Sequence, residues 1–216
     1  MSRWSWRARG PRFLAAFTGC VVLVTAAAIA WNNGIGEQLF PKRWVELAPG
    51  FYRSAQLHPR LIKRVLEERG VGVIVDLTGP NLSRATQRAE QEASAELGIS
   101  HHRFPLDGNG LGDIQRYADA IQVIAEAREN DLAVLVHCSA GARRAGGVVA
   151  SYQLLVEGKD PEAAYAELDR YGRTPVAETP LVTFLNQNME ALVDELVSRG
   201  TLDRAPHPLP VFAPPD

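Results

Sequence analysis

The sequence contains only two cysteines among its 216 residues, Cys20 and Cys138. Cys20 lies in an apolar stretch near the N-terminus, far along the chain from Cys138. A disulfide framework within the folded part of the chain is therefore excluded, and stability must come from packing. The sequence also lacks internal repeats and an excess of charge, because charged residues make up 22% and hydrophobic residues 46%. This composition is typical of one well-buried globular domain and argues against disorder.

Beyond residues 1–12, basic residues do not outnumber acidic ones. The formal net charge is −2, although four arginines fall within residues 1–12. The rest of the chain is therefore more acidic than the total indicates, which disfavours nucleic acid as a partner. The only adjacent histidines, His101 and His102, would face opposite ways on a strand and cannot bind one ion together. We expect no metal and no cofactor.

Residues 13–31 form a run of nineteen residues without charge. This length approaches the roughly 20 residues that span a bilayer and exceeds the roughly 7 to 15 apolar residues of a cleaved signal peptide. The preceding arginines would keep the N-terminus in the cytoplasm, so the pattern favours a single-pass anchor with the domain on the extracytoplasmic side of the cell membrane. The alternative is export after signal cleavage, because 28–30 (AIA) fits a small-x-small cleavage site.

The chain divides into five segments: a basic segment 1–12, the anchor or signal segment 13–31, a linker 32–47, a domain 48–200 and a Pro-rich tail 201–216. Within the domain, short apolar runs alternate with stretches of helical periodicity. Strands are expected at 51–53, 71–75, 99–104 and 132–136, and helices at 59–69 and 83–97 and after residues 113, 144, 160 and 179. This order predicts an α/β fold with a mostly parallel central sheet flanked by helices on both faces, and a functional site at the strand C-terminal ends.

One loop carries the strongest chemical signal. The unbroken apolar run 132–136 is typical of a parallel strand that is covered on both faces, and a helical pattern begins after Arg144. The loop between them turns backbone N–H groups and the positive end of a helix toward one point, where a phosphate and a thiolate are both stabilised. Cys138 is then a nucleophile. Arg144 can bind two phosphate oxygens with its planar guanidinium, which a lysine could not match.

Residues 137–144 (HCSAGARR) resemble the His-Cys-x5-Arg signature of the cysteine-dependent protein tyrosine and dual-specificity phosphatases. Together with 51–56 (FYRSAQ), 73–77 (VIVDL) and 104–107 (FPLD), they follow the order seen in small bacterial dual-specificity-like phosphatases. The resemblance implies a phosphomonoester hydrolase that forms a phosphocysteine on Cys138 and needs no metal. Its substrate would be a phosphorylated protein, a phospholipid or a small phosphate ester. The phosphate would be bound by Arg144 and by the loop residues Ser139, Ala140, Gly141, Ala142 and Arg143.

Two aspartates are candidates for the general acid. Asp107 opens a glycine-rich stretch that is typical of a mobile loop, and a carboxyl group there could protonate the leaving oxygen and later activate water. Asp113 precedes an apolar-periodic run, which favours a helix cap. The resemblance gives His137 a supporting role in lowering the thiol pKa, whereas Asp76 and Arg53 are expected to be structural.

Two residues depart from the phosphatase pattern. Ala145 stands where a Ser or Thr usually stabilises the departing thiolate, so the phosphocysteine should break down slowly. Arg143 stands where relatives often have an acidic or polar residue, and it would favour a second anionic group on the substrate or pair with a surface acid. Ala145 and an oxidising location leave a phospho-ligand-binding pseudophosphatase open as an alternative. A rhodanese-like sulfurtransferase is a weaker one, because Arg144 and Asp107 argue against it.

Overall fold

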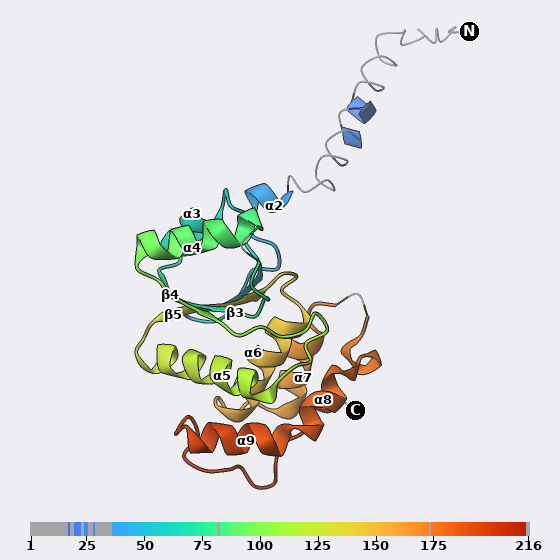
Figure 1. The fold of residues 1–216 in the computed structure, drawn as a ribbon. Helices are drawn as coiled ribbons and strands as arrows, with labels where there is room; N and C mark the ends of the chain where they lie inside the picture. Colours follow the sequence, from blue (N-terminus) through green and yellow to red (C-terminus); the bar gives the residue numbers. More distant parts are fainter. Residues whose placement is uncertain are drawn as a thin grey trace, which may run out of the picture. The chain divides into compact units, whose positions relative to one another are not determined.

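The computed structural model describes residues 17, 20–22, 24, 25, 28, 36–81, 83–172 and 174–214 (Figure 1). The chain forms two compact units, Met1–Phe40 and Pro41–Asp216. In the first unit, the described positions between 17 and 28 are helical, and the short helix α2 spans Gly36–Leu39. Most of the expected anchor, 13–31, lies outside the described residues. Among those that are described, no helix is both long and apolar enough to cross a membrane.

The second unit is built on a five-stranded sheet in the order β1-β2-β5-β3-β4. Strands β2 and β3 both run parallel to β5, and β4 runs parallel to β3, whereas β1 is antiparallel to β2. The expected mostly parallel sheet is therefore confirmed, with the apolar strand β5 at its centre. The strand bounds are β1 Val45–Ala48, β2 Phe51–Ala55, β3 Val71–Asp76, β4 Ser100–Arg103 and β5 Ala133–Cys138.

Strand β1 begins within the stretch 32–47 that the sequence suggested as a linker and ends at Ala48. It pairs with β2 across the two-residue connection Pro49-Gly50, where Gly50 adopts a φ of +71° that favours glycine. The compact unit accordingly begins at Pro41, before the expected domain boundary at residue 48. A four-residue edge strand is too short to give a clear periodic signal, which is why the sequence did not indicate it.

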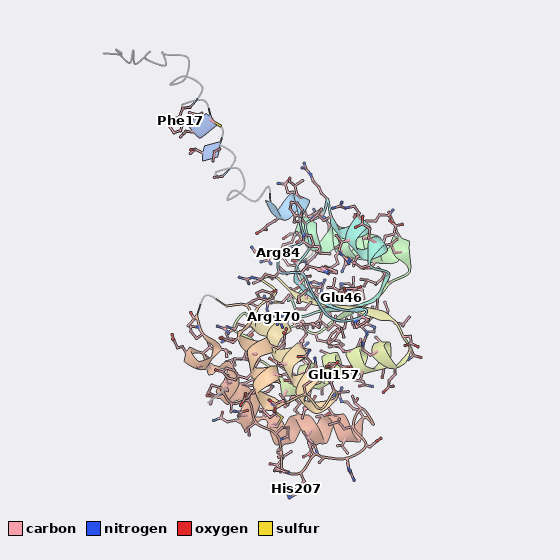
Figure 2. The ribbon with its side chains drawn as sticks, turned by 180° about the vertical axis from the view of Figure 1, so that it is seen from behind. Phe17, Glu46, Arg84, Glu157, Arg170 and His207 are labelled. Carbon is pink, nitrogen blue, oxygen red and sulfur yellow. The ribbon has the colours of Figure 1, made fainter. Side chains whose placement is uncertain are left out.

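Helices cover both faces of the sheet, as expected from the alternating pattern (Figure 1). Helices α3 and α4 enclose one apolar core with one face, and α5 to α9 enclose a larger core with the other. In Figure 2, Arg84 at the start of α4 lies on one side of the sheet, and Glu157 and His207 lie on the other. The helix bounds are α3 Ile62–Glu68, α4 Ala85–Leu97, α5 Ile114–Glu129, α6 Arg143–Leu155, α7 Pro161–Asp169, η2 Val176–Glu178 (a 3-10 helix), α8 Pro180–Gln187 and α9 Met189–Ser198.

Local sequence signals set several of these helix ends. The side chain of Asp113 accepts a hydrogen bond from Gln115 N (3.0 Å), and Asp160 caps α7 in the same way. Some helix bounds differ from expectation, and α3 begins at Ile62 rather than at residue 59. Ser83 does not cap α4, because its hydroxyl donates to Asn81 Oδ1 and the helix begins at Ala85. The single apolar stripe after residue 179 is divided between α8 and α9, where the Asn188 side chain donates to the Phe184 carbonyl.

The Pro-rich tail is held against the domain near its end. Phe212 is 2% exposed, and its backbone N–H and carbonyl both bond to the side-chain amide of Asn186 on α8. The described part of the tail therefore forms a strap over the helical layer.

Candidate active site

The strand–loop–helix arrangement around Cys138 is present as the apolar pattern predicted. Cys138 is the last residue of β5, and α6 begins five residues later at Arg143. The Cys138 carbonyl accepts a hydrogen bond from Gln56 N (2.8 Å), which extends the pairing between β5 and β2 beyond the strand end. The thiol is therefore held at the C-terminal edge of the sheet, on the strand that occupies its centre.

Gly141 explains how the loop can lie so close to β2. It adopts a φ of +63°, and a Cβ added there would lie 2.4 Å from Ala55 N and 2.6 Å from the carbonyl carbon of Ser54. A backbone neighbour cannot yield as a flexible side chain can, so any side chain at position 141 would push the loop away from the strand. The tight turn of the loop depends on glycine at this position.

Arg53 supports the loop through hydrogen bonds to its backbone. Its side chain is fully buried, and Nη2 donates to the carbonyl oxygens of Gly141 (3.3 Å) and Ala142 (3.0 Å). Because the carbonyl and N–H of a trans peptide point in opposite directions, these bonds turn the N–H groups of Ala142 and Arg143 toward the inside of the loop. Nη1 donates to the backbone oxygen of Glu167 (3.0 Å) and pairs with its carboxylate. Arg53 thus orients the loop amides, in agreement with its expected structural role.

The loop favours the thiolate form of Cys138. Burial by itself would raise the pKa of the thiol, because the side chain is 1% exposed. The backbone N–H groups of Ala145, Ala142 and Ala140 and the charge of Arg144 outweigh this effect, so the net change lowers the pKa of Cys138. The thiol is therefore a better nucleophile at neutral pH than an ordinary buried cysteine.

His137 lies in a buried cluster of charged groups behind the thiol. Its Nε2 is 3.1 Å from Glu90 Oε2 and 4.0 Å from Asp76 Oδ1, with all three side chains at most 1% exposed. Burial would lower the pKa of His137, but the two carboxylates raise it to about 9. Burial likewise favours the neutral form of Glu90, yet His137 and His101 lower its pKa to about 2. His137 is therefore an imidazolium next to the nucleophile.

The same cluster contains donors of the kinds that bind metals. One ligand atom each from Asp76, Glu90 and His101 lie within 4.8 Å of one another, a grouping that the sequence did not predict. The Asp76 carboxylate already accepts bonds from Thr78 N and Arg103 Nε (both 2.8 Å). The Glu90 carboxylate is contacted by His101 and His137. These donors are engaged with cations and an amide, so they fit a charge network better than a metal site.

A pocket of about 310 Å³ opens above the loop. Cys138 and Arg144 both line it, and Arg144 Nη1 donates to the Leu77 carbonyl (3.3 Å). Of the other predicted phosphate-binding residues, Ala140, Ala142 and Arg143 line the pocket, whereas Ser139 and Gly141 do not. The full lining is Arg43, Gly108, Cys138, Ala140, Ala142, Arg143, Arg144, Gly172, Thr174 and Thr179.

The two candidate acids differ in their surroundings. Asp113 caps α5, so its carboxylate is already a hydrogen-bond acceptor for the helix. Asp107 is exposed, in a turn closed by bonds from its N–H to the Leu111 carbonyl and from Gly110 N to its own carbonyl (both 2.9 Å). Its side chain does not line the pocket, but the next residue, Gly108, does. The Asp107 carboxyl group is therefore adjacent to the pocket lining without being part of it.

Sequence reasoning missed the lining residues Gly172, Thr174 and Thr179, and also three residues that contact the loop or its supporting side chains. Glu90 could have been suspected, because it is a charged residue on the face of a helix that packs against the sheet. Glu167 gave no such signal. Arg43 was assigned to the linker, yet its Nη1 donates to the Ala140 carbonyl (2.7 Å) and its guanidinium lies 5.8 Å from the Tyr171 ring centroid.

Residues 52–159, half of the chain, match the family described as "Polymorphic toxin system, DSP-PTPase phosphatase" (Tc-R-P). The chain belongs to this phosphatase family. Its members act as phosphoric monoester hydrolases through a cysteine, so the protein is a cysteine-dependent phosphatase of the dual-specificity type. Neither the pseudophosphatase nor the sulfurtransferase alternative receives support from these comparisons.

Solved phosphatase structures share the fold of this family member. TpbA of P. aeruginosa is 19% identical over 67% of this chain and 83% of that chain, with a TM-score of 0.53. The catalytic core of the PP-IP phosphatase Siw14 of S. cerevisiae is 14% identical over 74% and 94%, with a TM-score of 0.57. PTPMT1 in complex with PI(5)P is 18% identical over 59% and 81%, with a TM-score of 0.50. No curated protein sequence matches the chain.

Proposed function

We propose that the protein hydrolyses phosphate monoesters in two displacements at Cys138. The thiolate attacks phosphorus, the ester oxygen leaves with a proton from Asp107, and a phosphocysteine forms. Asp107 then takes a proton from water as the water attacks phosphorus, which releases inorganic phosphate and restores the thiolate. The observation that carries this proposal is the position of Cys138, whose thiol faces three backbone N–H groups and Arg144 in one pocket.

Arg144 and the loop amides supply the positive charge for this reaction. The loop N–H groups that favour the thiolate are also directed at the place where phosphate oxygens would lie. Arg144 offers a planar guanidinium on the same side, suited to the charge that spreads over these oxygens in the transition state. His137 supports the reaction from behind the nucleophile.

The proposal that Asp107 is the acid rests on its position next to the pocket and on the engagement of its rival. No carboxylate is found among the described residues that line the pocket, and Asp107 is adjacent to Gly108, which does line it. Asp113, the rival, is engaged as a helix cap.

The test is hydrolysis of a chromogenic phosphate ester by the full-length protein and by Cys138→Ser. The variant should lose turnover and keep affinity for the ester. Cys20→Ser is the matched control, because it removes the other thiol, which is exposed and outside the site. If the parent binds phosphate esters without releasing phosphate, the protein is the binding-only pseudophosphatase that Ala145 leaves open. Full activity in Cys138→Ser would refute the assignment of the nucleophile.

For the substrate, we propose a phosphate ester small enough to enter the pocket. The protein resembles structures named as a PP-IP phosphatase and as PTPMT1 in complex with PI(5)P, which supports phosphorylated small molecules and lipid headgroups alongside phosphoproteins. The pocket volume of about 310 Å³ is at the lower end of the roughly 300 to 1,000 Å³ that small-ligand sites have.

We also propose that residues 13–31 anchor the protein in the cell membrane with its catalytic domain outside the cytoplasm. The support is the uncharged run and the arginines before it. The full-length protein should stay with membranes after a carbonate wash, and external protease should digest the domain. Release of a soluble product beginning near Trp31 would establish signal cleavage instead.

A further inference from the structure

Among the residues that the structure describes, three arginines line the active-site pocket with their guanidinium groups: Arg43, Arg143 and Arg144. Within the described part of the chain, no acidic side chain lines this pocket and none of the three arginines has a carboxylate at ion-pair distance. By contrast, the buried Arg53 and the largely buried Arg103 each pair with a carboxylate. The pocket therefore carries positive charge that the described protein does not neutralise.

Arg43 and Arg143 are held in place by uncharged partners. Arg43 Nη1 donates to the Ala140 carbonyl (2.7 Å), and Arg143 Nη2 donates to the Thr174 carbonyl. A guanidinium has five N–H donors, so each side chain keeps further donors for a ligand. Because these contacts already restrict both side chains, binding an anion would cost less conformational entropy than at a free surface arginine.

The backbone of Arg43 is itself unusual. It adopts a φ of +52°, which is uncommon for a residue other than glycine and costs free energy. The residue lies just before β1, and this conformation accompanies the placement of its side chain over the loop rather than along the edge strand. Strain of this kind persists where the surrounding structure fixes a side chain in a required position.

The pocket has more room than one phosphoryl group needs. Its volume of about 310 Å³ falls within the roughly 300 to 1,000 Å³ of sites that enclose whole small molecules. The loop amides and Arg144 are enough to bind the phosphoryl group at Cys138. Space and two arginines then remain for another part of the substrate.

We propose that Arg43 and Arg143 form a second anion subsite, so that the preferred substrates are phosphate esters carrying a second phosphate group. The proposal rests on the proposed function, because it takes the first phosphoryl group to be bound at Cys138. It sharpens the expectation for Arg143, which pairs with a backbone carbonyl rather than with a surface acid.

The test compares the full-length protein on phenyl phosphate and on the ortho, meta and para isomers of benzenediol bisphosphate. The isomers place the second phosphate at different separations from the first. A bisphosphate can present either of its two phosphates to Cys138, which alone doubles kcat/KM. Only a ratio to phenyl phosphate above two therefore indicates a preference. At least one isomer should exceed phenyl phosphate by about tenfold, the effect of one charge-assisted hydrogen bond. A ratio of about two or less for all isomers would overturn the proposal.

Arg43→Gln and Arg143→Gln should each reduce the ratio of kcat/KM for the preferred bisphosphate to that for phenyl phosphate. Arg43→Lys, which keeps the charge, should retain part of the preference, and its phenyl phosphate activity and thermal unfolding report whether the loop is intact. The matched control is Arg64→Gln, an exposed arginine of α3 that does not line the pocket, and its ratio should be unchanged. Equal losses on both substrates in all Arg43 and Arg143 variants would show that these residues only position the loop and would overturn the subsite.

A further comparison asks whether the second phosphate belongs to a soluble molecule or to a lipid headgroup. Glycerophosphoinositol bisphosphate and phosphatidylinositol bisphosphate in mixed micelles present the same headgroup without and with the lipid chains. A preference for either bisphosphate over the corresponding monophosphate supports the subsite. The compound with the higher kcat/KM shows whether the soluble or the lipid-linked ester is the better substrate. Titration of Cys138→Ser with benzenediol bisphosphate gives binding without turnover, and affinity no higher than for phenyl phosphate counts against the subsite. Absence of Cys138-dependent hydrolysis of every ester would instead refute the proposed function.

Discussion

Arg53 and Glu167 form an ion pair beneath the active-site loop, with side-chain exposures of 0% and 3%. The guanidinium joins three elements, because it lies on β2, pairs with α7 and donates to the carbonyls of Gly141 and Ala142. The orientation of the loop amides therefore depends on a contact between residues that are distant in sequence.

Arg53→Lys should impair both stability and catalysis. A lysine keeps the charge but cannot donate to the two loop carbonyls and to Glu167 in the same planar geometry. Breaking a buried pair costs about 3–5 kcal/mol, and we expect a loss near the lower end because the charge remains. Urea unfolding and kcat/KM measure the two effects. Arg64→Lys is the exposed control, and an Arg53→Lys protein with parental stability and activity would contradict the bracing role.

Glu90→Gln tests the buried charge network through its dependence on pH. The carboxyl pKa lowered to about 2 gives stability that is present above its usual 4.5 and is lost as pH falls toward 2. The imidazole pKa raised to about 9 gives stability that is present below 6.5 and is lost as pH rises through 9. The loss in unfolding free energy caused by Glu90→Gln should therefore be largest between pH 4.5 and 6.5. Urea unfolding over a pH series measures it.

The same variant should change the nucleophile. Without Glu90, His137 loses positive charge, so the pKa of the Cys138 thiol should rise and the pH profile of its alkylation by iodoacetamide should shift upward. Glu96→Gln is the control, because Glu96 pairs with Lys63 in an exposed position. A stability difference that is constant with pH, together with an unshifted alkylation profile, would rule out the network as an influence on the thiol.

Three glycine-to-alanine variants separate backbone strain from steric contact. Gly79→Ala has open space and no positive φ, so stability should change little, whereas Gly158→Ala has open space but a φ of +63° and should lose about 1–3 kcal/mol. Gly141→Ala combines the same φ with a 2.4 Å approach to Ala55 N, so it should lose more stability and most of its activity. Thermal unfolding and kcat/KM measure the losses of stability and activity in the three variants. Equal behaviour of the last two would show that the loop does not need this close approach.

The two aspartates should respond differently to substitution by asparagine. Asp107→Asn should lower kcat by roughly 100-fold and remove one limb of the pH–rate profile, because a general acid is lost. Asp113→Asn should leave kcat nearly unchanged and alter stability by no more than the roughly 1 kcal/mol of a helix cap. Measuring kcat across pH for both variants decides between them, and the reverse pattern would make Asp113 the acid.

The sequence predicted those parts of the site that arise from neighbouring residues. The apolar run of β5 and the cap at Asp113 are local signals, and each corresponds to an observed strand or helix end. The contacts of Glu90 with His137 and of Arg53 with Glu167 could not be read in this way. Each joins residues from different elements, so only the packing of the helices against the sheet brings them together.

Arg43 illustrates a second reason why sequence reasoning fell short. A single arginine in a segment that lacks periodicity has no local feature that points to a site. Its role follows from the edge strand β1, whose four residues gave too little pattern to be recognised. The turn that leads into this strand places the side chain over the active-site loop.

The absence of a hydroxyl at Ala145 should affect how fast the phosphocysteine breaks down. Ala145 is fully buried, and its backbone N–H faces the thiol, but it offers no hydroxyl to the departing thiolate. Breakdown of the phosphocysteine should therefore limit the rate, and Ala145→Ser should raise turnover by about tenfold, since a hydrogen bond to a charged group contributes about 1.5–3 kcal/mol. Steady-state kcat for the parent and the variant measures this change. Unchanged turnover in Ala145→Ser would show that the missing hydroxyl does not matter.

The most direct test of the central claim is to trap that intermediate. The full-length protein is mixed with a chromogenic phosphate ester, quenched during turnover, and mapped by mass spectrometry for a phosphoryl group. We expect phosphorylated Cys138 to approach one equivalent per chain in the parent, to decrease in Ala145→Ser and to be absent in Cys138→Ser. Hydrolysis that proceeds with no phosphoryl group on Cys138 at any time, or with the group on another residue, would contradict the mechanism.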